Sequence, residues 1–248
     1  MSDLLNKIDP EFSPDKNIEE TDFQTKFQHF LTRTDTQYTI AKHNYLIDRG
    51  IENRLLENLL EFLPDGAIIA GGFALSILNE DKNAKDIDIF FTSEKALKDT
   101  LELFLNPPED AWAYKGYKFE NPGTSDEILK KHKGSRYISG THELRPHIQL
   151  LKMVYYTDAA HVIDTFDFTV SQLAFTNKNF IFNGLSMMDV ARKRLVLHRM
   201  QFPASTLRRL VKYTSKGYYA CPGSLVTVCE AIKNFSGEPD INEIVYVD

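Results

Sequence analysis

The run DIDIFF, from Asp86 to Phe91, constrains the fold more than any other feature of this sequence. Its apolar residues are β-branched or aromatic, which favours a strand. Side chains alternate along a strand, so Asp86 and Asp88 point to one face while Ile87 and Ile89 point to the other. The run therefore predicts a strand that is buried on one face and carries two carboxylates on the other.

Two carboxylates this close repel each other, and each raises the pKa of the other. A hard divalent cation, which takes oxygen ligands, would offset the repulsion. The alternative is a strand at the surface of a sheet whose two acids are solvated. Aspartate is disfavoured in strands, so the spacing of Asp86 and Asp88 is uncommon by chance, but the pair alone leaves both interpretations open.

Two glycines, Gly71 and Gly72, lie between a short apolar run at residues 67–70 and a helical pattern at residues 73–79. Backbone N–H groups at such a junction can approach a phosphate at the positive end of the helix dipole. The alternative is a tight turn that needs glycine only for its dihedral angles. Together with Asp86 and Asp88, however, the glycines predict a phosphate site beside a metal site, which metal-assisted nucleotidyl transfer requires.

Composition limits the class of protein. The chain has 248 residues, of which 42% are hydrophobic, so it can bury a sizeable core and extensive disorder is not expected. No apolar run approaches about 18 residues and the first residues lack a signal-peptide pattern, so we expect neither a membrane span nor secretion. The two cysteines, Cys221 and Cys229, favour a reduced cytoplasmic compartment.

Charge is unevenly distributed along the chain. The net charge of −6 argues against a protein coated with nucleic acid. From Arg192 to Lys216, however, eight Lys or Arg residues occur without any Asp or Glu. We therefore expect a local basic surface on an otherwise acidic protein.

The order of elements predicts a mixed α/β (α+β) fold that becomes helical towards the C-terminus. We expect an N-terminal arm over residues 1–45 with a helix near residues 23–31, a catalytic domain over residues 46–185, and a helical C-terminal region over residues 186–248. Helices are expected near residues 51–63, 73–79, 97–105 and 125–133. Strands are expected near residues 67–70, 86–92, 112–119, 148–156 and 166–175, the last forming a hairpin with residues 180–182.

The stretch AGGFALSILNEDKNAKDIDIFF, residues 70–91, resembles the signature of the DNA polymerase beta-like nucleotidyltransferase superfamily. That signature is a hydrophobic residue, Gly-Gly or Gly-Ser, a short spacer, and Asp-x-Asp or Asp-x-Glu on a strand. Members include polynucleotide adenylyltransferases, CCA-adding enzymes, and antibiotic and toxin-type nucleotidyltransferases. The resemblance implies a small mixed sheet with flanking helices. This chain departs from the pattern at Phe73, where many members have a serine, and the nearest substitute is the hydroxyl of Ser76.

The resemblance also implies a third carboxylate on a neighbouring strand, as a general base or a metal ligand. The stretch HVIDTFDFTVSQLAF contains Asp164 and Asp167, which would face opposite ways on one strand. We favour Asp167, because it is flanked by apolar residues as Asp86 and Asp88 are, and Asp164 stays the alternative. Gln149 cannot act as a base, and we interpret it as a hydrogen-bonding strand residue.

The basic segment contains Arg208, Lys212 and Lys216 on one helical face, with Tyr213 nearby. In the families that this chain resembles, a cation contacts the nucleotide phosphates and an aromatic ring stacks on the base. This implies that Lys212 and Tyr213, with Gly71 and Gly72, bind the nucleotide. A second basic cluster, KKHKGSRY at residues 130–137, is either a loop that touches nucleic acid or triphosphate, or ordinary surface.

The sequence therefore predicts a cytoplasmic, metal-dependent nucleotidyltransferase in which Asp86, Asp88 and Asp167 hold Mg²⁺ or Mn²⁺. The substrate would be a nucleoside triphosphate, ATP included, and the acceptor an RNA 3′ end or a protein hydroxyl, as in toxin-like members. The alternatives are a catalytically silent nucleic-acid-binding module and, more remotely, a glycosyltransferase that uses Asp-x-Asp. A compact core with a short helical tail would suit a phage or viral enzyme.

Overall fold

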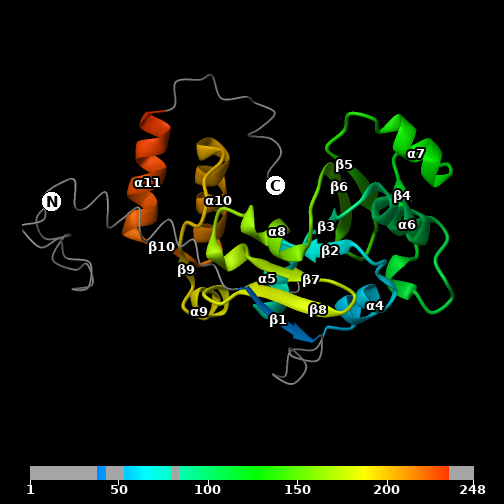
Figure 1. Ribbon diagram of the computed structural model, residues 1–248, viewed down its shortest axis with the longest axis horizontal. Helices are drawn as coiled ribbons and strands as arrows, with labels where there is room; N and C mark the ends of the chain where they lie inside the picture. Colours follow the sequence, from blue (N-terminus) through cyan, green and yellow to red (C-terminus); the bar gives the residue numbers. More distant parts are fainter. Residues whose placement is uncertain (1–37, 43–52, 80–83, 235–248) are drawn as a thin grey trace, which may run out of the picture. The chain divides into compact units, whose positions relative to one another are not determined.

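The computed structural model describes residues 38–42, 53–79 and 84–234, and a mixed β-sheet of eight strands forms its centre (Figure 1). The strands are β1 Tyr38–Lys42, β2 Ala67–Ala70, β3 Asp86–Phe91, β4 Lys118–Phe119, β5 Tyr137–Thr141, β6 His147–Tyr155, β7 Leu173–Phe175 and β8 Asn179–Asn183. Their order in the sheet is β1-β8-β7-β2-β3-β6-β5-β4. Only the β3–β6 pair is parallel among these strands, and it contains the predicted carboxylates.

Eight helices surround the sheet within the described residues. They are α4 Arg54–Phe62, α5 Gly72–Leu78, α6 Glu94–Leu105, α7 Ser125–Lys131, α8 Ala159–Asp164, α9 Ser186–Ala191, α10 Pro203–Ser215 and α11 Pro222–Lys233. A small parallel pair, β9 Arg194–Leu195 and β10 Tyr219–Ala220, lies between the last helices. None of these helices is long and apolar enough to span a membrane.

The sheet has a large core on one face. Ile69, Ile87 and Ile89 are fully buried there, and they pack with apolar residues of α4, α5 and α6. The other face holds a smaller core, where Phe90 packs with Val162 of α8. Helix α8 packs against this second face over β2, β7 and β8, and Leu151 of β6 also packs against this core.

The far half of the sheet is more exposed on its second face. Along β5, Ile138 and Gly140 are buried while Tyr137 and Thr141 are exposed, and the same alternation begins β6. Helices α6 and α7 lie against the buried side (Figure 1). The second face of β5 and β6 is on the same side of the sheet as Asp86 and Asp88; Tyr137 and Met153 are exposed there, while Gln149 and Leu151 are partly buried.

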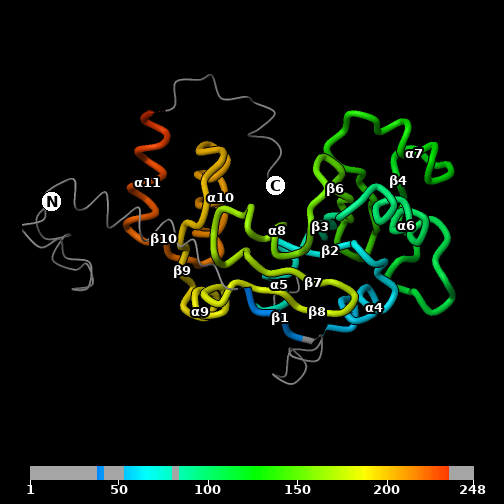
Figure 2. Tube along the Cα trace, viewed as in Figure 1, coloured from blue at the N-terminus to red at the C-terminus, as the bar shows by residue number. Residues whose placement is uncertain are grey.

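The C-terminal helices α10 and α11 lie side by side, at the opposite end from α6 and α7 (Figure 2). Each begins with a proline, Pro203 or Pro222, which occupies the first turn, where a helix tolerates it. The Tyr218 hydroxyl accepts a 2.8 Å hydrogen bond from Asn79 Nδ2, and Lys193 lies over the Tyr218 ring. These contacts fix the segment between α10 and α11 to the C-terminal end of α5, the end opposite the predicted glycines.

Most local predictions are confirmed: the expected helices appear as α4, α5, α6 and α7, and the expected strands as β2, β3, β6 and the β7–β8 hairpin. All described residues fall in one unit, Thr36–Asp248, so the two sides of the predicted division at residue 185 pack together. The arm predicted over residues 1–45 contains strand β1, which pairs with β8. The helix predicted near residues 23–31 lies outside the described residues.

Two predicted strands are wrong over most of their length. Residues 112–114 form a 3₁₀ turn, because the Asn58 side chain accepts a 2.8 Å hydrogen bond from the Ala113 N–H and the buried Tyr114 hydroxyl donates to the Leu59 carbonyl. Residues 166–172 also turn, because Thr169 bonds to the Val196 carbonyl instead of a neighbouring strand. In both places a tertiary contact overrides the β propensity.

Replacing Ile89 by alanine should lower the free energy of unfolding by about 2–5 kcal/mol, because it leaves a cavity behind a fully buried side chain of β3. The measurement is urea denaturation at equilibrium. Ile40→Ala on β1 is the matched control, since Ile40 is 68% exposed, and it should cost at most about 0.5 kcal/mol. Equal losses in the two variants would contradict the position of β3 at the centre of the core.

Candidate active site

Asp86 and Asp88 lie on the central strand β3, and both side chains are partly buried. Antiparallel pairing with β2 places Ala70 beside Asp88, so the strand that leads to Gly71 ends next to the carboxylates. Parallel pairing with β6 places Gln149 on the other side of Asp88. The two carboxylates therefore lie on one face of the sheet, as the alternation predicts.

The pKa of Asp88 is raised to about 7. Burial is the largest cause, and the neighbouring Asp86 carboxylate adds to it. The charges of Lys212 and Arg209, both on α10, act in the opposite direction. Asp88 is thus a carboxyl group whose ionised form needs positive charge nearby, and α10 supplies part of that charge.

The backbone conformation and the space for a side chain differ between Gly71 and Gly72. Gly71 has a φ of +79°, which side chains rarely adopt, and a Cβ there would lie 3.7 Å from Asp88 Oδ2 and 3.9 Å from the Phe166 ring. Gly72 has no such φ, and a Cβ there would meet nothing within 4 Å. The turn therefore requires Gly71, whereas nothing in the folded chain requires Gly72. Its exposed backbone leaves room for a ligand to approach next to Asp88.

Asp167 is buried and engaged by α10. Its carboxylate accepts a 3.0 Å hydrogen bond from the Thr206 hydroxyl and forms an ion pair with Arg209. In the part of the chain that the structure describes, no group of three or more His, Cys, Asp or Glu side chains could hold a metal ion. The role of Asp167 as a third metal ligand stays a prediction, and here this carboxylate binds Arg209.

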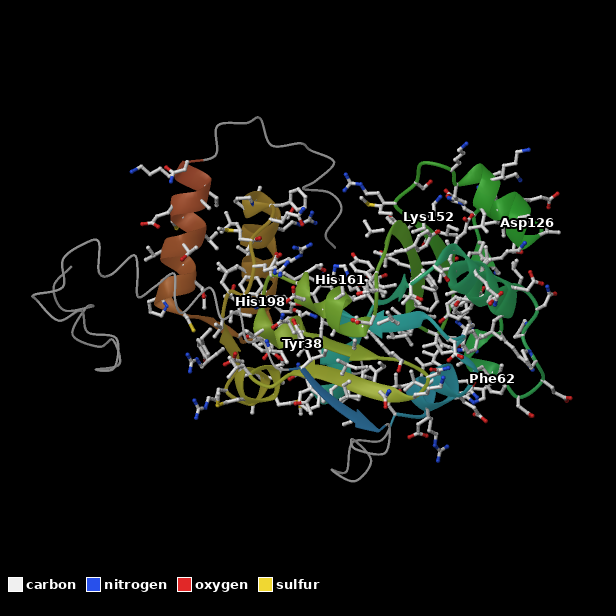
Figure 3. All side chains as sticks on the ribbon, in the orientation of Figure 1. Tyr38, Phe62, Asp126, Lys152, His161 and His198 are labelled. Atoms are coloured by element: carbon white, nitrogen blue, oxygen red, sulfur yellow. The ribbon has the colours of Figure 1, made fainter. Side chains whose placement is uncertain are left out.

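Asp164, the alternative third acid, belongs to a separate network, two of whose members, Tyr38 and His198, are labelled in Figure 3. Its carboxylate accepts hydrogen bonds from the Tyr38 hydroxyl at 2.7 Å and from His198 Nε2 at 3.1 Å, and it pairs with Arg199. Burial alone would raise its pKa, but Tyr38, His198 and Arg199 outweigh that effect and hold the pKa below its ordinary value. Asp164 therefore ties β1 to the segment before α10.

Helix α10 carries Lys212 and Tyr213, the predicted nucleotide-binding residues, and its cations act on the Asp88 carboxylate. Lys212 is exposed and acts on Asp88 through its charge. Tyr213 is half-buried, its hydroxyl lies 2.8 Å from Ser171 Oγ, and its ring packs edge-on against Phe168. Burial raises the pKa of Tyr213, and the negative charges of Asp167 and Asp88 raise it further. Base stacking by Tyr213 and phosphate binding by Lys212 stay predictions.

Sequence reasoning missed Arg209. It grouped cations at a spacing of four and selected Lys212, whereas the face that meets Asp167 carries Thr206 and Arg209. Leu210, the buried apolar residue of this helix, was the available signal, because Arg209 directly precedes it. Ser76 is not a phosphate ligand, since it is buried and its hydroxyl donates to the Phe73 carbonyl at 2.7 Å.

The donor set fits a magnesium ion. Mg²⁺ in proteins is commonly bound by one or two carboxylates, with substrate phosphates and water completing its shell. Asp86 and Asp88 supply two carboxylates on one face, and their mutual repulsion is relieved by a bound cation. The set is oxygen-only, which suits a hard cation rather than zinc.

Comparison with known families gives two matches in sequence. A protein-family model described as "Gabija anti-defense 2 family protein" matches residues 22–193. A curated protein named "Gabija anti-defense 2", from Bacillus phage SPbetaL7, is 30% identical over 166 residues. That alignment covers 65% of this chain and 36% of the phage protein, so this chain spans about a third of that relative.

Solved structures with a similar fold include CCA-adding enzymes. A CCA-adding enzyme in complex with ATP has a TM-score of 0.56 at 15% identity, over 82% of this chain and 50% of that chain. The Thermotoga maritima CCA-adding enzyme in complex with tRNA has a TM-score of 0.52 at 15% identity, over 84% of this chain and 51% of that chain. At this identity the likeness establishes the fold, which is mixed α/β of the nucleotidyltransferase type as predicted.

Asp88→Asn should stabilise the metal-free protein increasingly as pH rises. The folded pKa of Asp88, about 7, exceeds its ordinary value of 3.8, so stability is lost as pH rises between these values and the proton leaves. We expect the gain over wild type in urea denaturation with chelator to be on the order of 2 kcal/mol larger at about pH 8 than at pH 5, discounted for partial exposure. Asp126→Asn, an exposed acid of α7, is the control; a pH-independent gain for Asp88→Asn would contradict the account.

Proposed function

The chain belongs to the Gabija anti-defense 2 family, and we propose that it transfers a nucleoside monophosphate from a nucleoside triphosphate to an acceptor hydroxyl. One observation carries the proposal. Asp86 and Asp88, the exposed backbone of Gly72 and the charges of the α10 cations come together where β2 ends and β3 begins. Nucleotidyl transfer requires these parts together: a cation site, access for phosphates and fixed positive charge.

In the proposed reaction the acceptor oxygen attacks the α-phosphorus, a new P–O bond forms, and the bond to the bridging oxygen of pyrophosphate breaks. The acceptor hydroxyl loses its proton to solvent. Asp86 and Asp88 would hold a divalent cation, which when bound supplies positive charge that stabilises the transferring phosphate. Lys212 and Arg209 add positive charge from α10. The protein mainly positions groups and stabilises charge, which is the usual division of work in phosphoryl transfer.

Asp167 has a positioning role in this proposal. The Thr206 hydroxyl donates to the Asp167 carboxylate, and this carboxylate holds Arg209, whose charge acts on Asp88. A planar guanidinium held in this way suits bidentate contact with phosphate oxygens. Asp167 would then act on the triphosphate through Arg209, and not as a ligand of the cation.

The comparisons support the proposal without deciding the substrate. CCA-adding enzymes of similar fold have been solved with ATP, with CTP and with tRNA, so a nucleotide and an RNA are the first candidates for substrate and acceptor here. The family description adds an activity against a defence named Gabija, and we propose that the transfer serves that activity. The chain spans only part of the length of these relatives. The proposal therefore does not extend to the parts of those proteins that this chain does not match.

The other interpretations have less support. A silent binding module would be expected to have lost one of the two acids, and both Asp86 and Asp88 are present on a folded β3. A glycosyltransferase gives no reason for an open glycine beside the carboxylates. If the acceptor is a protein, as in toxin-like members, the reaction is the same and the nucleoside monophosphate is transferred to a protein hydroxyl.

The transfer itself is tested by incubating purified protein with Mg²⁺ and each α-³²P-labelled nucleoside triphosphate, with RNA, DNA and cell lysate as acceptors. We expect label on a macromolecule, and at least about a hundredfold less with Asp86→Ala/Asp88→Ala, because the cation has no ligands. Asp99→Ala/Asp126→Ala, two exposed acids on α6 and α7, is the matched control and should keep full activity. Full activity in the Asp86/Asp88 variant, with its fold intact by circular dichroism, would refute the proposal.

The role of Asp167 is tested by Asp167→Asn. If Asp167 positions Arg209, the variant should raise KM for the triphosphate about tenfold with a smaller effect on kcat, and Arg209→Gln should do the same. If Asp167 is instead a ligand of the cation, kcat should fall as far as it does in Asp88→Ala. Arg208→Gln, on the neighbouring position of α10, is the comparison variant.

A further inference from the structure

Strand β6 places two polar side chains beside the carboxylate pair, and the proposed reaction has not used them. His147 is the register partner of Asp86, and Gln149 is the register partner of Asp88. Side chains of residues that pair across two strands lie on the same face of the sheet. The histidine and the glutamine therefore share the face of the two carboxylates. Ile148, which lies between them, is buried on the opposite face.

The two strands are held close together at this point. Neighbouring strands of a sheet lie about 4.8 Å apart. The His147 N–H donates a 2.7 Å hydrogen bond to the carbonyl of Lys85, the residue before Asp86, and this bond fixes the start of β6 beside the start of β3. An imidazole at this position can reach an oxygen atom that is bound at Asp86.

The fold itself does not engage these two side chains. His147 is exposed and Gln149 is partly buried. In the part of the chain that the structure describes, no hydrogen bond or ion pair of either side chain is present. No buried side-chain nitrogen or oxygen of that part lacks a partner, so the Gln149 amide reaches solvent. Both groups are therefore accessible to a ligand beside the carboxylates.

The glycines lie on the other side of the carboxylates from β6. Strand β3 has β2 as one neighbour and β6 as the other, and β2 leads into Gly71 beside Asp88 (Figure 1). A Cβ on Gly71 would lie 3.9 Å from the Phe166 ring, and the next residue, Asp167, pairs with Arg209. The exposed glycine backbone and the Arg209 cation are therefore on the β2 side.

The proposed reaction needs its two ends on opposite sides of the carboxylates. In transfer at phosphorus, the attacking oxygen and the leaving oxygen lie roughly in line. With pyrophosphate held on the β2 side, the acceptor hydroxyl approaches from the β6 side, where His147 and Gln149 lie. A neutral imidazole and an amide oxygen each accept a hydrogen bond from a hydroxyl, and neither adds a negative charge beside the carboxylates.

We propose that His147 and Gln149 hold the acceptor hydroxyl during the transfer. His147, beside Asp86, accepts a hydrogen bond from that hydroxyl and directs its oxygen at the α-phosphorus, while Gln149 binds a neighbouring polar group of the acceptor. The bonds that form and break are those of the reaction proposed above. This inference rests on the proposed transfer, and it adds the side from which the acceptor comes and the two side chains that position it.

The test separates the acceptor from the triphosphate in steady-state kinetics. The probes are α-³²P-labelled ATP with Mg²⁺ and a short single-stranded RNA that has a free 3′ hydroxyl, or the lysate protein if that takes the label instead. His147→Ala should lower kcat/KM for the acceptor at least about tenfold and leave KM for ATP within about twofold of wild type. Gln149→Leu should raise KM for the acceptor about fivefold. His147→Gln keeps a hydrogen-bonding group and should restore most of the activity.

The matched control is His161→Ala, because His161 is an exposed histidine of α8 to which no role in the reaction is assigned (Figure 3). Its kinetic constants should equal those of wild type. Binding of a fluorescent ATP analogue with Mn²⁺ measures the triphosphate site without catalysis, and His147→Ala should bind it as wild type does. Wild-type transfer by His147→Ala, or a loss that appears in analogue binding and in KM for ATP, would overturn the inference.

The same experiment separates this inference from the proposed function. If wild-type protein labels no acceptor, the transfer is refuted and this inference with it. If wild type, His147→Ala and Gln149→Leu label the acceptor at equal rates, this inference alone is refuted and the transfer stands. If label falls in His147→Ala through the constants for the acceptor, with analogue binding kept, both are supported.

Discussion

The rest of the structure depends on the repulsion between two carboxylates held on one face of a central strand. Because β3 is buried on its other face by Ile87 and Ile89, Asp86 and Asp88 cannot turn away from each other without unpairing the sheet. Burial first, and the Asp86 charge second, raise the pKa of Asp88 to about 7, so the ionised form of this carboxyl is costly in the absence of a cation. A site that is costly when empty gains most from a bound cation, and for that reason the pair indicates function more strongly than a solvated acid would.

The fold arranges everything else around this pair. On one side, β2 ends beside Asp88 and leads directly into Gly71, while α10 adds Arg209 and Lys212. On the other side, Gln149 of β6 lies beside Asp88. Asp164 at the end of α8 and Asp167 just after this helix serve the first side, since Asp164 pairs with Arg199 before α10 and Asp167 pairs with Arg209 on α10.

How well the sequence predicts a feature depends on how far apart along the chain the interacting residues are. The path from α4 to β3, including both glycines and both carboxylates, follows from local patterning, because each element there agrees with its own hydrophobic period. The role of Asp167 as a third metal ligand stays a prediction, and its contacts with Thr206 and Arg209 could not be predicted because these partners are 39 and 42 residues away. No local pattern shows such a contact.

The same limit explains the missed elements. Strand β1 pairs with β8, which is far along the chain. Which side chains of β5 and β6 share a face follows only from the register of these two strands. Helix α8 is a different case, because its N-cap Asp158 accepts a hydrogen bond from the His161 N–H at 2.8 Å, and this local signal was present in the sequence. Tertiary contacts therefore account for the missed residue Arg209 and the missed strand β1, and an overlooked cap accounts for the missing helix.

The most direct test of the central account is whether the carboxylate pair binds a divalent cation together with a triphosphate. Electron paramagnetic resonance of free Mn²⁺ reports this, because bound Mn²⁺ disappears from the signal of the free ion. The account predicts that wild-type protein removes Mn²⁺ from solution, more strongly when a nucleoside triphosphate is present, and that Asp86→Asn/Asp88→Asn loses this binding at an unchanged fold. Equal Mn²⁺ binding by wild type and by that variant would contradict it.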